Sequence, residues 1–174
     1  PLYPILAALY DMGNEVITIS GARNKDLLIL REELSSISTR LLIATDDGSS
    51  GRKGFVTDVL KDILEELGID EVVAIGPVPM MAAVAKVTKE FDVKTIVSLN
   101  SLMIDGTGMC GGCRVTVAGE TKFTCVDGPD FDASLVDFDE ILRRLRFYRD
   151  QEHQSLEQYE KHQCHIQAAA DKLE

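Results

Sequence analysis

Three cysteines lie close together in the second half of the 174-residue chain. Cys110 and Cys113 have the CxxC spacing that lets two thiolates share one metal, and Cys125 follows after eleven further residues. Those eleven residues alternate between apolar and polar types on both sides of a turn at 118–120, which predicts a β-hairpin. Because a hairpin brings its two ends together, the sequence predicts that three sulfurs surround one point.

The full pattern around these cysteines is Dx4Cx2Cx11C, with Asp105 as its first member. Plant-type [2Fe–2S] sites have the spacing Cx4Cx2C followed by a distant cysteine, so Asp105 stands where the first cysteine would be. A carboxylate is anionic like a thiolate and can bind iron. Small residues let backbone N–H groups approach the sulfurs, and four glycines lie in this stretch: Gly106, Gly108, Gly111 and Gly112. The predicted metal ligands are Asp105, Cys110, Cys113 and Cys125.

A structural zinc ion is the alternative, and it would need a fourth ligand such as Cys164 or a histidine. Zinc sites usually combine CxxC with a second close pair of ligands, and the sequence contains no such pair. Cys164 lies in a polar stretch far beyond Cys125 and is expected to be an incidental thiol. His153, His162 and His165 are expected to be solvated. The spacing favours iron–sulfur over zinc.

Helix and strand patterns alternate along the first hundred residues. Helices are expected near residues 2–10, 24–34, 56–67 and 77–91, and strands at 15–20, 41–45, 71–75 and 94–99. Asn24 and Gly68 are the expected caps of the second and third helices. This order predicts an α/β fold in which a parallel sheet carries helices on both faces.

The connections that follow the strands contain small, charged or flexible residues. Ligands of such sheets bind beyond the carboxyl ends of the strands, so these connections are candidate cofactor-binding positions. They are Gly21, Ala22 and Arg23; Asp46, Asp47 and Gly48; and Gly76, Pro77 and Met80. The alternative is that they are only tight turns, with Met80 and Met81 packed in the core.

The chain opens with a helix instead of a strand and a glycine-rich loop, and residue 1 is proline. A doubly wound domain normally opens with that strand and loop, so we expect the carboxyl-terminal part of a longer protein, with the first strand missing. Three regions are predicted: a nucleotide-binding α/β domain over 1–100, a metal-binding hairpin module over 101–136 and a helical tail over 137–174.

Composition and charge exclude several classes of protein. Acidic residues outnumber basic ones 29 to 18, and a net charge of −11 argues against binding nucleic acid or an anionic membrane. The longest apolar stretch, 72–85, is too short and too interrupted by glycine and proline to span a bilayer. No export signal is visible, so a soluble cytoplasmic protein is expected. In that compartment clustered cysteines are expected to bind metal or do redox chemistry rather than form disulfides.

Several segments carry a family resemblance. They are GARNKD at 21–26, TDDGSSGRKGFVTD at 45–58, AIGPVPMM at 74–81, DGTGMCGGCRVTV at 105–117 and FTCVDGPDFD at 123–132. Together they resemble the small subunit of the electron-bifurcating NADH-dependent reduced ferredoxin:NADP oxidoreductase, also called a ferredoxin–NADP reductase or sulfide dehydrogenase subunit. This family belongs to the ferredoxin reductase superfamily, which combines an FAD-binding barrel, a nucleotide-binding α/β domain and a terminal [2Fe–2S] module.

The resemblance implies an oxidoreductase subunit that passes electrons between NAD(P)H, FAD and a [2Fe–2S] cluster. The partner would be a larger subunit with flavin and [4Fe–4S] clusters, and ferredoxin would be involved indirectly. The turns at 21–23, 46–48 and 76–80 would face NAD(H) or NADP(H), and the acidic turn favours NADH. FAD would be held mainly by the missing amino-terminal domain, so this stretch alone is expected to be inactive. The cofactors carry the chemistry, and no catalytic acid or base is expected.

The same residues leave three further functions open. The electron-transfer subunit of dihydroorotate dehydrogenase is a relative of this family, but it has cysteine at the position of Asp105 and ends soon after its last ligand. Here 49 residues follow Cys125. A zinc-stapled binding domain without enzymatic activity and a ferredoxin-like carrier that binds no nucleotide also fit the cysteine spacing.

The polar stretch after Arg149 has few apolar residues. A helix of this composition is rarely stable unless it packs on something else. It is therefore expected to be either a helix that docks on the partner subunit or a frayed surface helix.

Overall fold

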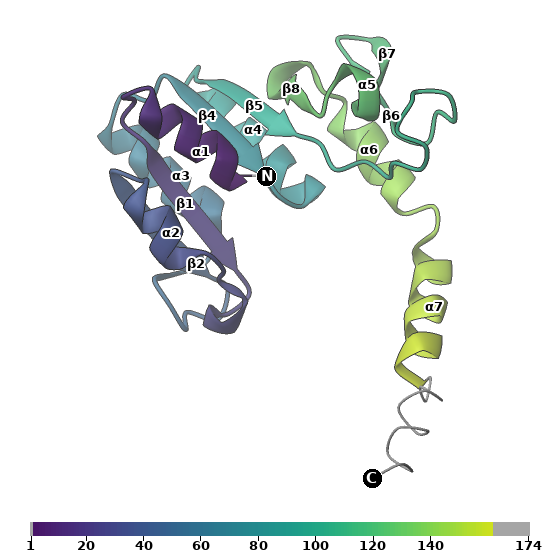
Figure 1. Ribbon diagram of the computed structural model, residues 1–174, viewed down its shortest axis with the longest axis horizontal. Coiled ribbons are helices and arrows are strands. Elements are labelled where there is room, and N and C mark those ends of the chain that lie inside the picture. Colours follow the sequence, from purple (N-terminus) through teal and green to yellow (C-terminus); the bar gives the residue numbers. More distant parts are fainter. Residues whose placement is uncertain (1, 162–174) are drawn as a thin grey trace. The chain divides into compact units, whose positions relative to one another are not determined.

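The computed structural model describes residues 2–161, and its first half is built on a parallel three-stranded sheet (Figure 1). The chain begins with α1 (Leu2–Asp11) and enters β1 (Ile17–Ala22). β1 pairs with β2 (Arg40–Thr45), which pairs with the short β3 (Arg52–Lys53), and both pairings are parallel. All three strands therefore end at the same edge of the sheet, as the expected ligand-binding arrangement requires.

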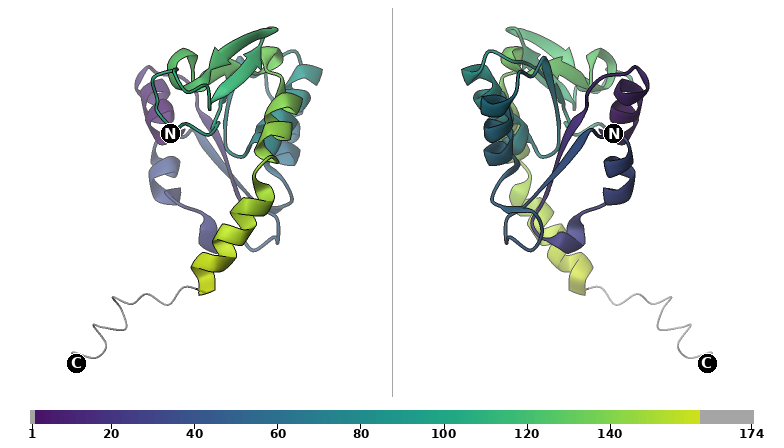
Figure 2. Two further views of the ribbon diagram at one scale, coloured as in Figure 1. Left: turned by 90° about the vertical axis from the view of Figure 1, so that its right-hand side faces the viewer. Right: turned by 90° about the vertical axis from the view of Figure 1, so that its left-hand side faces the viewer.

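Helices cover both faces of this sheet. On one face, Leu6 of α1 packs with Val16 and with Leu34 of α2 (Arg31–Ser36). On the other, α3 (Val56–Glu66) contacts β1 and β2. Figure 2 shows the strands between these two helical layers. The spacing of the buried side chains of α3, which are Val59, Leu60, Ile63 and Leu64, gives the helix one apolar stripe, as its sequence predicts.

A second three-stranded sheet follows. β4 (Glu71–Ile75) pairs in parallel with β5 (Lys94–Ser98), and β8 (Asp130–Asp132) adds to β5 in the antiparallel sense. The connecting helix α4 (Val78–Glu90) begins after Pro77 and buries Met81 completely. α4 also packs against α3, which joins the layers of the two sheets.

The predicted hairpin is confirmed. It consists of β6 (Arg114–Val117) and β7 (Glu120–Phe123), joined by a two-residue turn in which Ala118 and Gly119 have φ of 52° and 78°. The hairpin leads into the short α5 (Thr124–Asp127), then into β8 and the 3-10 turn η2 (Ala133–Leu135). The buried Thr124 hydroxyl donates to the carbonyl of Cys113 at 2.9 Å, which fixes α5 to the start of β6.

Contacts divide the chain into two units, Pro1–Phe138 and Asp139–Glu174. The second unit contains most of α6 (Phe138–Leu145) and all of α7 (Arg149–Lys161). The three-region division at residues 100 and 136 stays a prediction. Among residues 2–161, every helix is too short or too polar to cross a membrane.

The structure corrects three details of the sequence prediction. The stretch expected as one helix at 24–34 is a 3-10 turn, η1 (Lys25–Leu27), followed by α2, because Leu30 takes a left-handed backbone conformation (φ 54°) between them. Asn24 caps η1 instead of a long helix. α3 ends at Glu66, and Leu67 after it has an extended backbone, so Gly68 does not form a left-handed cap.

The expected parallel sheet is divided into two sheets, and β8 makes the second of them mixed. No strand pattern is visible in the sequence at 130–132, because β8 has only three residues and alternates aspartate with phenylalanine. Within residues 2–161, β1 and β4 each have one neighbouring strand, so each sheet has an open edge.

Candidate metal centre and nucleotide-binding edge

The hairpin brings two of the predicted ligands together. The Sγ atoms of Cys113 and Cys125 are 3.3 Å apart. Cys113, just before the hairpin, is buried, and Cys125 is half-buried. Two thiolates bound tetrahedrally to one metal at about 2.3 Å would be about 3.8 Å apart. A small outward movement of these side chains would therefore suffice for both to bind the same ion.

The two thiols differ electrostatically. The backbone N–H of Cys125 lowers the pKa of the Cys113 thiol, whereas the adjacent Cys113 sulfur raises the pKa of the Cys125 thiol. The backbone N–H of Gly108 acts on Cys125 in the opposite, lowering sense. Backbone N–H groups thus act on both sulfurs in the sense that favours the thiolate form.

Asp105 lies at the start of the loop that carries Cys110. Its Oδ1 accepts the backbone N–H of Thr107 at 2.9 Å, and its Oδ2 accepts the backbone N–H of Cys110 at 2.8 Å. The Thr107 hydrogen bond is the main cause that lowers the pKa of the Asp105 carboxyl, so this group is a carboxylate. The exposed Cys110 sulfur accepts the N–H of Gly112 at 3.4 Å, one residue before Cys113.

The four predicted ligands are thus neighbours along two connected loops, but they are not closed around one point. In the described part of the chain, no three histidine, cysteine, aspartate or glutamate side chains stand in positions to hold a metal ion together. The chemistry of the donor set nevertheless fits an iron–sulfur cluster, since three thiols and one ionised carboxylate are surrounded by backbone N–H groups. The ligand set stays a prediction.

Large apolar side chains surround these loops and are exposed. Ile104 lies beside Gly112 and the Cys110 sulfur, and Val126 lies beside Gly108. The most exposed members are Met109 at 88%, Ile104 at 74% and Leu102 at 63% of their full accessible surface. Contiguous exposed apolar side chains often mark an interaction site. We call these residues, Leu102, Met103, Ile104, Met109 and Val126, the apolar rim.

The first two predicted turns meet at the carboxyl edge of the parallel sheet. Gly21 and Ala22 are the last residues of β1, and they pair with Ala44 and Thr45 of β2. Beyond the strands, the backbone N–H of Asp46 donates to the carbonyl of Ala22, and that of Asp47 donates to the carbonyl of Arg23, both at 3.2 Å. Gly21 is a close-contact position, since a Cβ there would overlap the side chain of Val56 in α3.

The two acidic residues of the second turn have different surroundings. The Asp47 carboxylate accepts both the hydroxyl of Ser49, at 2.7 Å, and its N–H, at 2.9 Å. The Ser49 hydroxyl is the main cause that lowers the pKa of Asp47. By contrast, the exposed Asp46 carboxylate takes part in no hydrogen bond or ion pair within residues 2–161. The Asp46 carboxylate thus has both oxygens available to accept a hydrogen bond, for example from a ribose hydroxyl, whereas Oδ1 of Asp47 already accepts two.

The third predicted turn belongs to the other sheet. Gly76 and Pro77 follow β4, and Pro77 caps the amino-terminal end of α4. The end of the Met80 side chain lies over Gly76, where a Cβ would overlap it. Met80 is half-buried, whereas Met81 is part of the core, as the packing alternative predicts for that residue.

Phe55 is a candidate that the sequence patterns did not indicate. It lies between β3 and α3, its N–H donates to the carboxylate of Asp58 at 3.0 Å, and 66% of its surface is exposed. The next residue, Val56, packs on Gly21, so Phe55 lies beside the edge formed by the first two turns. The signal available in the sequence was an apolar aromatic residue between a glycine and a helix start.

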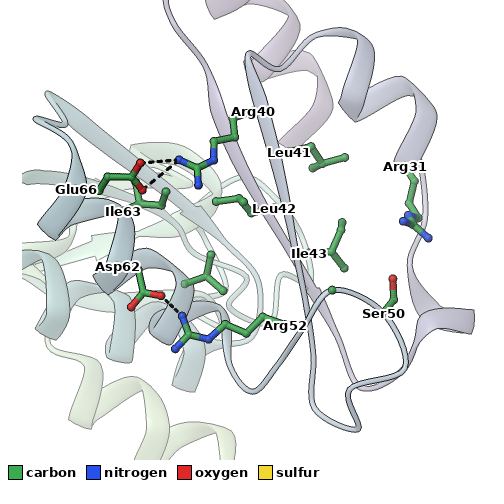
Figure 3. Close-up of a pocket in the computed structure, with 12 residues that line it drawn as sticks. Arg31, Arg40, Leu41, Leu42, Ile43, Ser50, Arg52, Asp62, Ile63 and Glu66 are labelled. Carbon is green, nitrogen blue, oxygen red and sulfur yellow. Dashed lines mark hydrogen bonds and ion pairs between the residues drawn. The ribbon is translucent and has the colours of Figure 1, made fainter.

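A pocket of about 470 Å³ lies elsewhere, on the outer edge of β2 (Figure 3). Arg40 pairs with Glu66 of α3 at 3.3 Å, and Arg52 pairs with Asp62 of α3. β3 pairs only with the last two residues of β2, so the rest of this edge is open. Charged side chains on an open strand edge discourage pairing with other chains, and this pocket contains none of the predicted site residues.

The remaining candidates from the sequence do not join either site. His153 is exposed and pairs with Glu157 one helical turn away, at 3.2 Å, which agrees with its expected solvation. Cys164, His162 and His165 lie outside the described residues.

Comparisons with known proteins place these features in a family. Residues 100–137 match the iron–sulfur cluster binding domain of dihydroorotate dehydrogenase B. A Thermotoga maritima protein described as a homolog of the electron transfer subunit of dihydroorotate dehydrogenase B (NAD(+)) is 51% identical over 160 residues, 92% of this chain and 56% of that protein. A probable electron transfer subunit of the same enzyme from Methanocaldococcus jannaschii is 39% identical over 74% of this chain and 50% of its own length.

A solved structure gives the same result. The structure of an NADH-dependent reduced ferredoxin-NADP oxidoreductase, studied for flavin-based electron bifurcation, superimposes with a TM-score of 0.82 at 50% identity. The match covers 92% of this chain and 58% of the chain in that structure. The chain therefore spans a little over half the length of the Thermotoga maritima protein and of the chain in the solved structure.

Proposed function

The chain belongs to the family of iron–sulfur electron-transfer subunits represented by dihydroorotate dehydrogenase B and the NADH-dependent reduced ferredoxin-NADP oxidoreductase, and we propose that it transfers electrons between a pyridine dinucleotide and a partner subunit. In this proposal Asp105, Cys110, Cys113 and Cys125 hold a [2Fe–2S] cluster. The observation that carries it is the hairpin that sets two thiols 3.3 Å apart beside the Asp105–Cys110 loop. When bound, the cluster accepts and donates single electrons.

The chain's own residues bind and orient the nucleotide at the carboxyl edge of the first sheet. The open Asp46 carboxylate accepts a ribose hydroxyl, which favours NADH over NADPH because a 2′-phosphate there would meet a negative charge. The exposed Phe55 ring stacks on the adenine ring. The exposed Arg23 guanidinium, in the neighbouring turn at the same edge of the sheet, binds the pyrophosphate. In this proposal the intact subunit also holds FAD.

The partner in this proposal is a larger subunit that contains flavin and [4Fe–4S] clusters, with ferredoxin reached through it. Solved and curated relatives are described as parts of an oxidoreductase or as electron transfer subunits, which supports a second subunit. Dihydroorotate dehydrogenase is the second candidate, and the names of the relatives favour it. Aspartate instead of cysteine at position 105, together with the 49 residues after Cys125, favours the ferredoxin-NADP type.

Anaerobic purification of the full-length subunit, with analysis of iron, acid-labile sulfide, zinc and flavin, tests this function. We expect two irons and two sulfides per chain, and Cys110→Ser and Cys113→Ser should lose both. Cys164→Ser is the matched control, because it should keep the cluster but would remove the fourth ligand of a zinc site. A colourless protein with zinc and no sulfide would reject the proposal. Activity with dihydroorotate instead of ferredoxin and NADP would select the second candidate.

A further inference from the structure

The Asp105 carboxylate closes a loop that contains little other structure. Its two oxygens accept the N–H groups of Thr107 and Cys110 at 2.9 and 2.8 Å, so one side chain spans the residues from 105 to 110. Gly106 and Gly108 lie inside this span with φ of 73° and 82°, conformations that the tight path requires. The carboxylate thus determines where the loop turns back.

The closed loop meets the residues around the hairpin in two places. The N–H of Gly108 acts on the Cys125 thiol, and the Cys110 sulfur lies over the N–H of Gly112, next to Cys113. Cys110 and Met109 are exposed, so burial contributes little to holding them there. The charge-assisted hydrogen bonds to the carboxylate therefore fix the backbone at Cys110, although its sulfur is exposed.

We propose that Asp105 is a positioning residue for Cys110, in addition to the ligand role that the proposed function gives it. The hydrogen bonds from the N–H groups of Thr107 and Cys110 hold the loop closed. When a cluster is inserted, one carboxylate oxygen would displace a water or thiolate ligand from iron, so one Fe–O bond would form as one iron–ligand bond breaks, and no electron would be transferred. This inference rests on the proposed function, because it assumes that the site receives iron and sulfide.

Aspartate and cysteine differ at this position in a way that separates the two roles. A thiolate binds iron at least as well as a carboxylate, so Asp105→Cys preserves a ligand. A thiol sulfur is only a weak acceptor and cannot span two N–H groups in different directions, so the same variant loses the loop closure. Asparagine keeps the shape and one carbonyl oxygen, but its amide nitrogen cannot accept an N–H.

The experiment uses the full-length subunit after anaerobic removal of the cluster by a chelator. Amide hydrogen exchange at Thr107 and Cys110 is measured for the wild-type protein and Asp105→Cys, followed by cluster reassembly from ferrous iron and sulfide, read from visible absorption. We expect Asp105→Cys to lose about tenfold in protection at both amides and to reassemble more slowly. It should reach the same final iron content, with a spectrum changed by the fourth sulfur.

Asp132→Asn is the matched control, since Asp132 accepts the N–H and hydroxyl of Ser134 away from the cysteines. It should leave exchange at Thr107 and Cys110 unchanged. If Asp105→Cys does not fold, Asp105→Asn supplies the comparison, with protection lost at one of the two amides.

Two results distinguish a failed positioning role from a failed function. If the wild-type subunit takes up no iron and sulfide, the proposed function fails. If it does, and Asp105→Cys matches the wild type in amide protection and in the rate of reassembly, the positioning role is overturned while the function stands.

Discussion

At the scale of single residues, Phe55 is the position where exposure and location together predict a contact with ligand. An aromatic ring that is 66% exposed gains nothing from the core, yet it lies beside the turns that carry Arg23 and Asp46. Stacking of a base on an aromatic ring contributes about 1–3 kcal/mol. A single exposed phenylalanine is ordinary elsewhere on a surface, so the neighbouring charged groups distinguish this one.

Phe55→Ala in the full-length subunit is therefore expected to raise the Kd of NADH about tenfold, which corresponds to the lower half of the stacking range. Titration calorimetry would measure this change. AMP should lose affinity by a similar factor, whereas nicotinamide mononucleotide should not, because only the adenine half uses the ring. Phe147→Ala is the control, since Phe147 is also exposed but belongs to the second unit, Asp139–Glu174. Equal NADH affinity in Phe55→Ala and the wild type would contradict the assignment.

Asp47 and Ser49 give a prediction about pH. Ser49→Ala removes the hydroxyl that contributes most to lowering the pKa of Asp47, so this pKa should move up toward the ordinary value of about 3.9. Because the folded pKa lies below the unfolded one, ionised Asp47 stabilises the fold above about pH 3.9, and this contribution disappears as the pH falls through the folded pKa. A carbon-13 NMR titration of the carboxyl group reads the shift. The control Ser50→Ala should leave the lowered pKa of Asp47 unchanged.

At the scale of elements, the path from β2 to β3 depends on Gly51. This glycine has φ of 66°, and a Cβ there would overlap the carbonyl oxygen of Ile43 in β2. The loop from Asp46 to Lys53 lies tightly against the strand because nothing projects from this position. The location of Phe55 and the start of α3 both depend on that close approach.

Gly51→Ala should consequently destabilise the protein by more than about 2 kcal/mol, through overlap added to backbone strain. Gly13→Ala is the matched control: Gly13 also has positive φ, at 83°, but no atom lies within 4 Å of the added Cβ. Its cost should be the strain alone, about 1 kcal/mol. Urea unfolding of the two variants measures the difference. Equal losses would show that the overlap relaxes without cost.

The sequence predicted elements well where periodicity is strong and less well where local backbone geometry decides. The apolar stripe of α3 and the strand β4 are confirmed. The break before α2 was missed, because a left-handed leucine at position 30 has no signature in apolar spacing. β8 was missed because it forms by pairing with β5, which is distant in the sequence, and a strand of three residues has no recognisable apolar pattern.

The candidate site follows the same division. The hairpin that returns Cys125 to Cys113 was predictable from alternation and a turn, both of which are local. The two hydrogen bonds of Asp105 were not, because they depend on how the glycines around it turn. The exposed position of Phe55 could not be predicted either, since an apolar residue beside a helix start normally predicts burial.

At the scale of the whole molecule, two strand edges and one group of exposed apolar side chains are available for contacts with other structure. In the described structure β1 and β4 each pair with one strand only, and the match covers 56% of the length of the Thermotoga maritima relative. The apolar rim around the cysteines gives a second surface, whose burial would remove water from the proposed cluster.

Met109 provides a test of whether a partner covers the apolar rim. Replacing this residue by glutamate should leave folding of the subunit unchanged, because the side chain is 88% exposed and buries little surface in the fold. If the rim is buried against a partner subunit, the charge should weaken association by at least tenfold in the assembled complex. Val126→Glu tests a second member of the rim, and Leu27→Glu, at an exposed leucine of η1, is the control. Unchanged association for both rim variants would place the partner elsewhere.

The helical tail makes the alternative location of the partner testable. In α7 the apolar side chains are few, and Leu156 and Tyr159 are exposed at 54% and 77%. An isolated polar helix of 13 residues is marginal in water, so α7 needs a contact to be stably folded.

Deleting residues 150–174 should then abolish co-purification with the partner subunit while iron and sulfide contents stay at wild-type values. The double variant Leu156→Asp and Tyr159→Asp should reproduce the loss if the helix face makes the contact, with Gln154→Asp as the control for charge. Full association of the truncated subunit would assign docking to the apolar rim or another surface and leave α7 as a solvated helix.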